Sequence, residues 1–306
     1  MKRALVTGAS GFLGRSVVSS LLQKGYEVHA CSRAMPSEIG ATCHSVDLLN
    51  HSQTIAALNA IRPSHLVHMA WNVDNGYWTS PSNLEWTSAT LNLLRAFHLS
   101  GGLRFIGAGT CAEYDWDSLP AFIKESTLHR PATLYGVAKN STRQLVESYC
   151  DLMGLSHAWG VLFMSYGSGE RPNRLVPSVI CNLLAGNEAK VTAGTQVRDF
   201  LDSRDVGAAF AALTDSDVIG SVNIASGQST AIKDVIKKIG DLLGRQDLLR
   251  IGALPTKQNE PDRIVADTTR LSSEVLFKPR IEIDEGLEST IAWWRTKIQP
   301  GQESLA

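Results

Sequence analysis

In the first half of the chain, short apolar runs alternate with segments whose apolar residues recur at helical spacing. The candidate strands are residues 3–7, 27–31, 42–46, 65–69, 104–106 and 157–163. The candidate helices between them are residues 12–23, 53–60, 83–99 and 134–153, and glycines stand near several of their ends. This alternation predicts a parallel sheet with helices on both of its faces.

The second half loses this regular alternation after residue 167. A loop at 168–177 is expected to cover a site, and helices are predicted at 176–185, 204–213, 231–243, 268–276 and 285–294. Short strands are predicted at 190–192, 222–225 and 250–251. We therefore predict an α/β fold in two parts. Residues 1–165 with about 195–225 are expected to form a doubly wound parallel-sheet domain, and about 166–194 with 226–306 a smaller α/β substrate lobe.

Composition and charge exclude several classes of protein. The 306 residues are 43% hydrophobic and include 29 Lys+Arg and 30 Asp+Glu, which is typical of a soluble globular protein with no general attraction to nucleic acid or membranes. No apolar window approaches the roughly 18 residues of a membrane span. Gly8 interrupts the basic and apolar start too early for a signal peptide. The five scattered cysteines lack CxxC spacing, so we expect reduced thiols, a cytoplasmic protein and no metal site.

A glycine series, Gly8-x-x-Gly11-x-x-Gly14, follows the first strand and opens the first helix. A sharp turn there lets a pyrophosphate approach backbone N–H groups at a helix N-terminus. A glycine series by itself also occurs in ordinary strand–helix turns, but at the first strand of an alternating pattern it predicts dinucleotide binding.

The end of the second strand predicts which dinucleotide is bound. An NAD enzyme would carry Asp or Glu there, whereas this chain has Ser32 and Arg33, and Arg15 follows the third glycine. These residues favour the 2′-phosphate of NADP(H), with NAD(H) as the alternative if both arginines are only solvated surface residues. Asp47-Leu48 after the third strand either contacts the adenine amine or simply leads the next helix.

Tyr135 and Lys139 are four residues apart on a predicted helix and therefore share a face. A nearby ammonium and a nicotinamide charge would lower the pKa of the phenol, so that Tyr135 could exchange a proton with a carbonyl or alcohol. Thr110, at the end of the fifth strand, could donate to the same oxygen. The alternative for the pair is a surface contact. Cys111 is a second candidate nucleophile or a packed thiol, and Glu113 is either a proton-shuttling acid or a structural carboxylate.

Together these elements resemble the extended short-chain dehydrogenase/reductase family, of the nucleotide-sugar epimerase/dehydratase type. The segments that carry the resemblance are TGASGFLG at 7–14, Asp47-Leu48, His68-Met69-Ala70, Gly109-Thr110 with Glu113-Tyr114, Pro131 ahead of Tyr135-Gly136-x-x-Lys139, Tyr166-Gly167, Arg198-Asp199-Phe200 with Arg204-Asp205-Val206, Asn223-Ile224-Ala225-Ser226-Gly227, Ala266-Asp267, Gly286-Leu287 and Ile291-Ala292-Trp293-Trp294. They cover nearly the whole chain.

The resemblance implies a Rossmann domain, a small lobe that clamps a nucleoside diphosphate sugar, and a homodimer through the long helices, including 134–153. It implies that Tyr135 is the acid/base, that Thr110 positions the substrate oxygen and that Lys139 tunes Tyr135. The expected cofactor-binding residues are Gly8, Ser10, Gly11, Phe12, Leu13, Gly14, Arg15, Ser32, Arg33, Asp47, Leu48, Ala70, Tyr135, Lys139 and Phe163. The expected substrate-binding residues are Thr110, Arg174, Arg198, Lys257 and Arg263.

Departures from the family pattern narrow the reaction. Cys111-Ala112 stand where dehydratases of the family carry Asp-Glu, and Met164 and Trp86 stand where Asn is usual. Trp71 and Trp78 are expected with Trp86 near the crevice, either stacked on sugar or base or packed in the core. We predict an NADP(H)-dependent reductase of a 4-keto nucleotide sugar. The alternatives are an NAD-dependent C4 epimerase and a non-enzymatic NADP-binding redox sensor.

Overall fold

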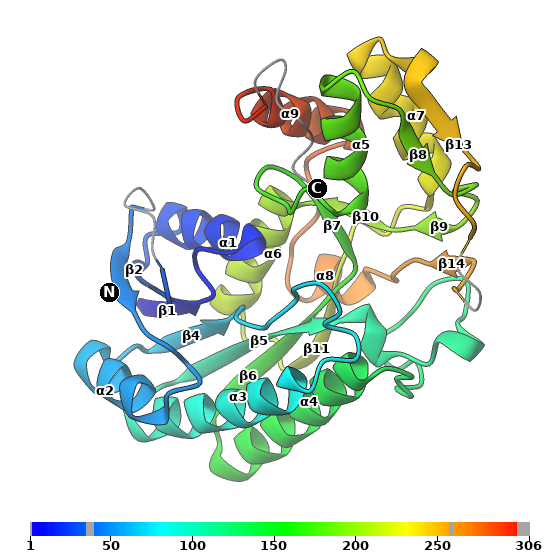
Figure 1. Ribbon diagram of the computed structural model, residues 1–306. Coiled ribbons are helices and arrows are strands. Elements are labelled where there is room, and N and C mark those ends of the chain that lie inside the picture. The colour runs from blue at the N-terminus through cyan, green and yellow to red at the C-terminus, as the bar shows by residue number, and fades with distance from the viewer. Residues whose placement is uncertain (1, 35–39, 257–259, 299–306) are drawn as a thin grey trace.

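The computed structural model describes residues 2–34, 40–256 and 260–298. Its centre is a seven-stranded sheet with the order β11-β6-β5-β4-β1-β2-β3, in which each strand runs parallel to its neighbours (Figure 1). The strands are β1 (Arg3–Thr7), β2 (Glu27–Ser32), β3 (Thr42–Ser45), β4 (His65–His68), β5 (Arg104–Thr110), β6 (Ser156–Leu162) and β11 (Gly220–Ile224). This confirms the predicted doubly wound α/β fold.

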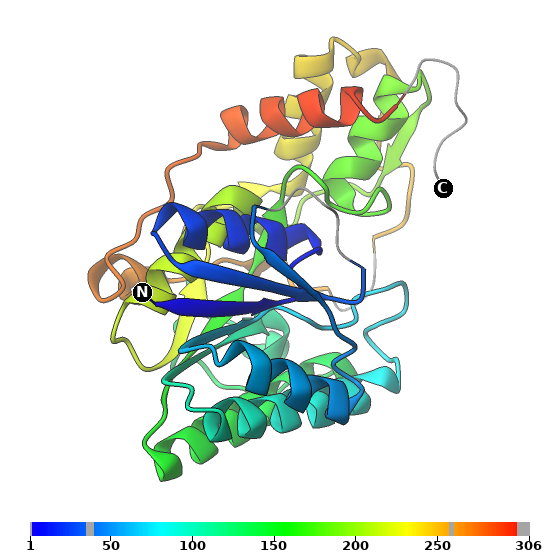
Figure 2. The ribbon, with the colours of Figure 1, turned by 90° about the vertical axis from the view of Figure 1, so that its left-hand side faces the viewer.

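Helices cover both faces of this sheet, as Figures 1 and 2 show. On one face lie α1 (Phe12–Gln23) and α6 (Ser203–Asp215). On the other lie α2 (His51–Ile61), α3 (Ser82–Leu99) and α4 (Leu134–Met153). The helices α1 and α6 pack closely, since a Cβ on Gly207 would lie 2.4 Å from the backbone of Ser16.

A second hydrophobic cluster lies away from the sheet, around α5 (Leu175–Leu184), α7 (Ile232–Leu243) and α9 (Ile283–Arg295). The paired strands β8 (Ala189–Val191) and β13 (Leu249–Ile251) border it. The described chain contains two further small sheets. One pairs β7 (Met164–Tyr166) with β10 (Phe200–Asp202), and the other has the order β12 (Thr230–Ala231), β9 (Val197–Arg198) and β14 (Arg263–Ile264). Leu271 of α8 (Thr269–Ser273) and Phe277, which follows this helix, pack into the core under α1 and α6. The division of the chain into two domains stays a prediction.

The fifth strand is longer than the predicted segment 104–106, because Gly107 and Gly109 belong to it. Their role is spatial: a Cβ on either glycine would lie 2.1 Å from the Trp159 side chain of the neighbouring strand. After Thr110 the chain turns through η1 (Cys111–Glu113) and η2 (Trp116–Ser118) toward α4. A third short helix, η3 (Gln246–Leu248), precedes β13.

Within the described ranges, every helix falls short of the combined length and apolar character that crossing a membrane requires.

Candidate active site

The three glycines form the turn between β1 and α1. Gly8 has a φ of +65°, and a Cβ on it would lie 2.8 Å from the backbone nitrogen of Ala70. A Cβ on Gly14 would lie 2.1 Å from the carbonyl oxygen of Gly8, which also accepts a 2.9 Å hydrogen bond from the amide of Gly11. Only glycine fits at positions 8 and 14. Phe12 and Leu13 begin α1 here, so the N-terminal N–H groups of the helix stand at the turn.

Hydroxyl groups and a cation gather where β2 ends. The Oγ atoms of Ser10 and Ser32 lie 2.5 Å apart, and Nε of Arg15 donates to the carbonyl oxygen of Ser10 at 2.9 Å. Arg33 follows Ser32 in the chain and is exposed. The structure therefore brings Ser10, Ser32 and Arg15 together beside the glycine turn.

The remaining expected cofactor residues lie at or just beyond strand ends. Asp47 follows β3, and its Oδ1 accepts from the amide of Leu49 at 3.1 Å, whereas Asn50 caps α2. A contact between the Asp47 carboxylate and the adenine amine stays a prediction. Leu48, Ala70 and Phe163 are all buried, after β3, β4 and β6 respectively.

Aromatic rings enclose the phenol of Tyr135. Tyr77 and Trp78, in the connection between β4 and α3, meet its ring edge-on at centroid distances of 4.8 Å and 5.5 Å. Burial raises the pKa of Tyr135, and a hydrogen bond with Thr110 opposes this rise. The expected lowering of the Tyr135 pKa includes the charge of a bound nicotinamide and stays a prediction, whereas loss of hydration is the dominant effect in the protein without cofactor.

Lys139 is buried four residues further along α4. Its Nζ donates to the carbonyl oxygen of Ala108 at 2.8 Å and lies 3.9 Å from the ring centroid of Trp71. Burial lowers the pKa of Lys139 to about 7, while the charge of Glu113 acts in the opposite direction. Trp71 is held in place because its Nε1 donates to Oδ1 of Asn83 at 2.9 Å. The side chain of Trp71 thus contacts Lys139.

Thr110 ends β5 and caps η1. Its Oγ1 accepts from the amide of Ala112 at 3.2 Å, and its own amide donates to Oε1 of Glu113 at 2.9 Å. The same carboxylate oxygen accepts from Nε1 of Trp159 at 3.1 Å. The hydroxyl of Thr110 lies near enough to the Tyr135 phenol to favour its ionised form, so β5 and the start of α4 place the predicted hydroxyl and phenol close together.

Cys111 is buried directly behind Thr110, and desolvation raises the pKa of its thiol to about 12. A thiol with this pKa is a poor nucleophile at neutral pH. The structure therefore favours packing over catalysis for Cys111.

Arg174 and Arg198, two of the cations expected to bind a substrate diphosphate, contact other side chains of the protein. Arg174 precedes α5, and its guanidinium carbon lies 5.3 Å from the ring centroid of Tyr77. Arg198 is buried on β9 and forms a 2.7 Å ion pair with Glu260. Substrate binding by Arg198 would therefore require this ion pair to rearrange.

Arg263 lies on β14, directly beside β9. Its Nε donates to the carbonyl oxygen of Ala121 at 2.8 Å, and its Nη2 donates to the hydroxyl of Ser229. Lys257 lies outside the described residues. The diphosphate role of these cations stays a prediction.

The neighbouring Asp199 is a structural carboxylate. It accepts from the amide and hydroxyl of Ser226 at 2.7 Å and 2.6 Å, and from the amides of Gly227 and Ala266 at 2.9 Å and 3.2 Å. These bonds tie β9 to the segments after β11 and β14.

Of the rings that cover Tyr135, sequence reasoning included Trp78 but missed Tyr77. Besides Tyr77, the loop of residues 73–78 carries Asp74, which pairs with Arg171 at 2.6 Å, and Asn75, whose Oδ1 accepts from Asn173 at 2.5 Å. The predicted loop at 168–177 therefore covers this segment. No residue spacing in the sequence indicates that the loop at 168–177 contacts residues 73–78.

Sequence reasoning also missed Arg143, although its position carries a signal. Tyr135, Lys139 and Arg143 follow one another at intervals of four residues and therefore share a face of α4. The Nε of Arg143 lies 3.3 Å from Oε2 of the buried Glu113.

Comparison with known proteins agrees with this geometry. The model of the NAD dependent epimerase/dehydratase family matches residues 4–225. A GDP-6-deoxy-D-mannose reductase of Pseudomonas aeruginosa is 26% identical, across 97% of this chain and 99% of that protein.

Two solved structures show the same fold. UDP-glucose 4-epimerase of Thermotoga maritima with UDP-glucose has a TM-score of 0.89 at 22% identity, covering 97% of this chain and all of that one. UDP-glucose 4-epimerase of Thermus thermophilus in complex with NAD has a TM-score of 0.87 at 22% identity, again over 97% of this chain and all of that one. The resemblance to the extended short-chain dehydrogenases/reductases is thereby confirmed. The family model spans more than half of the length of this chain, so the chain belongs to the NAD dependent epimerase/dehydratase family and is an enzyme of that kind.

Proposed function

We propose that this enzyme is an NADP(H)-dependent reductase of a 4-keto nucleoside diphosphate sugar. The observation that carries the cofactor preference is the grouping at the end of β2. Ser10 contacts both Ser32 and Arg15 there, and Arg33 follows, where an NAD-binding carboxylate would otherwise stand. Two cations and two hydroxyls suit a phosphate and offer nothing that repels it.

The glycine turn fits the pyrophosphate of this cofactor. The space that a Cβ would fill at Gly8 and Gly14 is closed by backbone, so the chain passes close to α1 and presents its N-terminal amides. Gly8, Gly11, Phe12 and Leu13 would hold the pyrophosphate, and Ser32 and Arg33 the 2′-phosphate. Once bound, the reduced nicotinamide supplies a hydride to the keto carbon.

The protonation state of Tyr135 supports the direction of reduction. Burial raises the pKa of Tyr135, so the phenol keeps its proton at neutral pH and can donate it to the keto oxygen. The hydroxyl of Thr110, already in contact with this phenol, would donate to the same oxygen. Lys139 would bind the ribose hydroxyls with the ammonium that now rests on Trp71.

Two further features favour a reductase over other members of the family. Cys111 and Ala112 provide no acid or base for the loss of water, since the thiol of Cys111 is buried with a raised pKa. The Pseudomonas aeruginosa relative, similar over nearly its whole length, is named as a reductase of a deoxy-sugar nucleotide. Arg174, Arg198, Arg263 and Lys257 are proposed to bind the substrate diphosphate.

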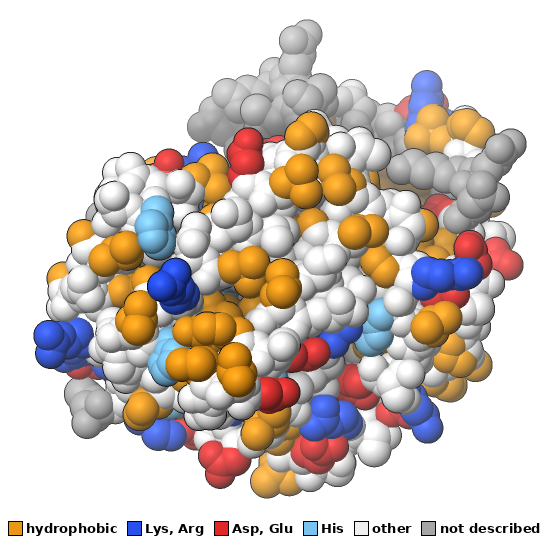
Figure 3. All heavy atoms as spheres, turned by 90° about the horizontal axis from the view of Figure 1, so that it is seen from below, with side chains coloured by type: hydrophobic (Ala, Val, Ile, Leu, Met, Phe, Trp, Pro, Cys, Tyr) orange, Lys and Arg blue, Asp and Glu red, His pale blue; other side chains and the backbone are white. Residues whose placement is uncertain are grey.

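We propose that the enzyme is a homodimer formed through α3 and α4. Val137, Leu145 and Leu152 are exposed by 44%, 50% and 81% and recur at helical spacing on α4, and Leu84 on α3 is exposed by 62%. Figure 3 shows hydrophobic side chains gathered on the face that carries these helices. Sedimentation should give a dimer that L145E dissociates, and a monomeric wild-type protein would contradict the assignment.

The function is tested by incubating the purified enzyme with 4-keto nucleotide sugars and either NADPH or NADH. A reductase consumes NADPH in a one-to-one ratio with the product alcohol, whereas an epimerase interconverts sugars without a net change in absorbance at the nicotinamide band. Tyr135→Phe should abolish turnover and leave NADPH affinity nearly unchanged. Interconversion without NADPH consumption would establish the epimerase instead.

A further inference from the structure

Glu113 is a completely buried carboxylate that the proposed reaction does not use directly. Burying a carboxylate is costly unless donors surround it. Its Oε1 accepts from the amide of Thr110 at 2.9 Å and from Nε1 of Trp159 at 3.1 Å. Its Oε2 lies 3.3 Å from Nε of Arg143 in an ion pair. Burial raises the pKa of Glu113, whereas the two N–H donors and the charge of Arg143 favour the ionised carboxyl, which has no acceptor for a proton among these contacts.

The fold makes room for this carboxylate at several positions. A Cβ on Gly109 would lie 2.7 Å from Oε1 of Glu113 and 2.1 Å from Nε1 of Trp159. A Cβ on Gly107 would overlap the same indole ring. Two glycines of β5 thus accommodate the tryptophan that donates to Glu113. A carboxylate that only capped the three-residue η1 would require neither these glycines nor the indole N–H of Trp159.

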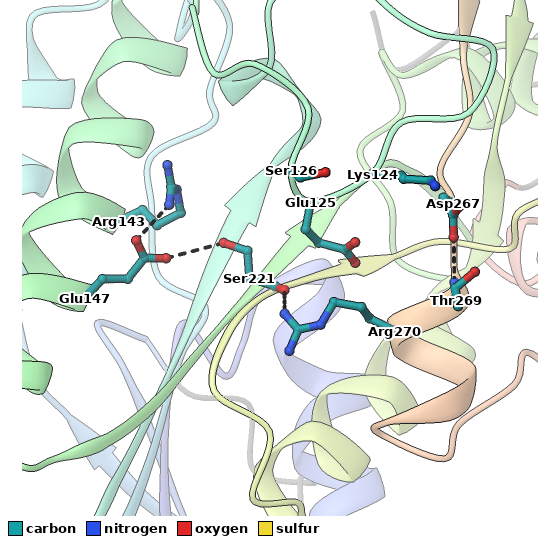
Figure 4. A pocket seen from close by; sticks show the side chains of 9 residues that line it. All are labelled: Lys124, Glu125, Ser126, Arg143, Glu147, Ser221, Asp267, Thr269 and Arg270. Carbon is teal, nitrogen blue, oxygen red and sulfur yellow. Dashed lines mark hydrogen bonds and ion pairs between the residues drawn. The ribbon is translucent and has the colours of Figure 1, made fainter.

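Arg143 connects the buried carboxylate to solvent. Its side chain is 12% exposed, and its guanidinium also pairs with Glu147 at 2.8 Å. Figure 4 shows both side chains at one end of a cavity of about 610 Å³ between α4, the edge strand β11 and the segment before α8. Ser221 lies beside Glu147, to which its hydroxyl donates at 3.4 Å, and the carbonyl oxygen of Ser221 accepts from Arg270. Glu147 therefore binds the outer side of the same guanidinium whose inner side faces Glu113.

Charged and titratable groups face Glu113 from each neighbouring element. On α4 these are Lys139, Tyr135 and Arg143, and on the segment after β5 they are Cys111 and Tyr114. His68 on β4 faces Lys139 and is held neutral by burial, which lowers the pKa of His68 to about 3. The negative charge of Glu113 favours the ammonium form of Lys139.

We propose that Glu113 is a positioning residue of the reductase: its carboxylate fixes Thr110 at the end of β5 and favours the ammonium form of Lys139, with Arg143 as its counter-ion. This inference rests on the proposed function for its catalytic meaning, but the electrostatic relationship exists in the protein without cofactor. Loss of hydration disfavours the ammonium of Lys139, and a fixed negative charge nearby favours it. A neutral Lys139 could not support the developing charge at Tyr135 during proton transfer.

The test measures the ionisation of Lys139 in the cofactor-free protein. In protein labelled with ¹³C at lysine Cε, the Lys139 signal is identified by its absence from K139M. Its titration midpoint should fall by about one pH unit or more in E113Q, which keeps the shape of the side chain and removes its charge. The matched control is E147Q, which removes the outer partner of Arg143 and should leave the midpoint nearly unchanged. An unchanged midpoint in E113Q, or an equal fall in E147Q, would overturn the inference.

A second variant keeps the proposal testable if E113Q does not fold. R143M removes a cation and leaves Glu113 with Lys139 as its remaining charged partner, so the midpoint should rise. A fall in R143M would contradict the proposal.

Turnover gives an independent readout. The alkaline limb of the kcat profile should move to lower pH in E113Q, in parallel with the Lys139 midpoint, while KM changes little. A shifted NMR midpoint without any reductase turnover in the wild type would refute the proposed function and keep the electrostatic pairing. Reductase turnover with an unshifted kcat profile in E113Q would refute the positioning role alone.

Discussion

The ammonium of Lys139 lies 3.9 Å from the centre of the Trp71 ring, and both groups are held by further hydrogen bonds. Cation–π contacts away from water contribute about 0.5–2 kcal/mol. A double-mutant cycle with W71L, K139M and the double variant should therefore show a coupling of about 1 kcal/mol or more in the free energy of urea unfolding. Additive single effects would mean that the contact contributes nothing to stability.

The lowered pKa of Lys139 predicts how stability depends on pH. Burial brings the pKa of Lys139 from its ordinary 10.5 to about 7 in the folded protein. Between these values the unfolded chain binds a proton that the folded protein does not, so the free energy of unfolding rises with pH in this window. The slope from this one residue is at most about 1.4 kcal/mol per pH unit.

K139M lacks the titrating group and provides the comparison. The stability of the wild type relative to K139M, measured by urea unfolding at pH 7 and pH 9, should increase by about 1–3 kcal/mol toward the higher pH. Other groups titrate in both proteins and cancel in the difference. A constant difference would show that Lys139 keeps an ordinary pKa in the folded state.

Gly14→Ala tests the close approach of α1 to the glycine turn. The added Cβ would lie 2.1 Å from the carbonyl oxygen of Gly8, so the helix must shift, at a cost of about 1–3 kcal/mol or more. Affinity for NADPH should fall with it, because the helix N-terminus moves away from the pyrophosphate.

Gly25→Ala is the matched control for this substitution. Gly25 has a φ of +79° with no atom near the position of a Cβ, so its substitution introduces backbone strain of about 1–2 kcal/mol without a clash. Calorimetric unfolding and NADPH titration should show similar or smaller destabilisation in G25A but unchanged affinity. Equal loss of affinity in both variants would disprove the role assigned to close packing at Gly14.

The fold and the local motifs follow from the sequence because short-range geometry determines them. The turn at Gly8–Gly14 and the pair Tyr135–Lys139 each depend on a few consecutive residues, and strand–helix alternation fixes where the strand ends meet. The environment of the phenol could not be predicted in this way. Tyr77 reaches Tyr135 from a connection far away in sequence, and burial of the phenol raises the Tyr135 pKa in the protein without cofactor.

The side-chain contacts of the arginines expected to bind substrate could likewise not be predicted from the sequence. Arg198 was assigned from a motif, but its partner Glu260 is 62 residues away and joins it through the pairing of β9 with β14. A motif identifies the residue type at a position and not the ion pair that the tertiary fold imposes on it.

Arg33→Ala tests the proposed preference for NADP(H). A charge-assisted hydrogen bond between the guanidinium and the 2′-phosphate contributes about 1.5–3 kcal/mol, so R33A should weaken NADPH binding about ten- to a hundredfold. Binding of NADH, which lacks that phosphate, should stay nearly unchanged. Titration by intrinsic fluorescence measures both dissociation constants. R95A is a suitable control, since Arg95 is exposed on α3, across the sheet from α1, and should affect neither cofactor. If R33A weakened both cofactors equally, Arg33 would not read the phosphate, and Arg15, already bonded to Ser10, would be the residue to test next.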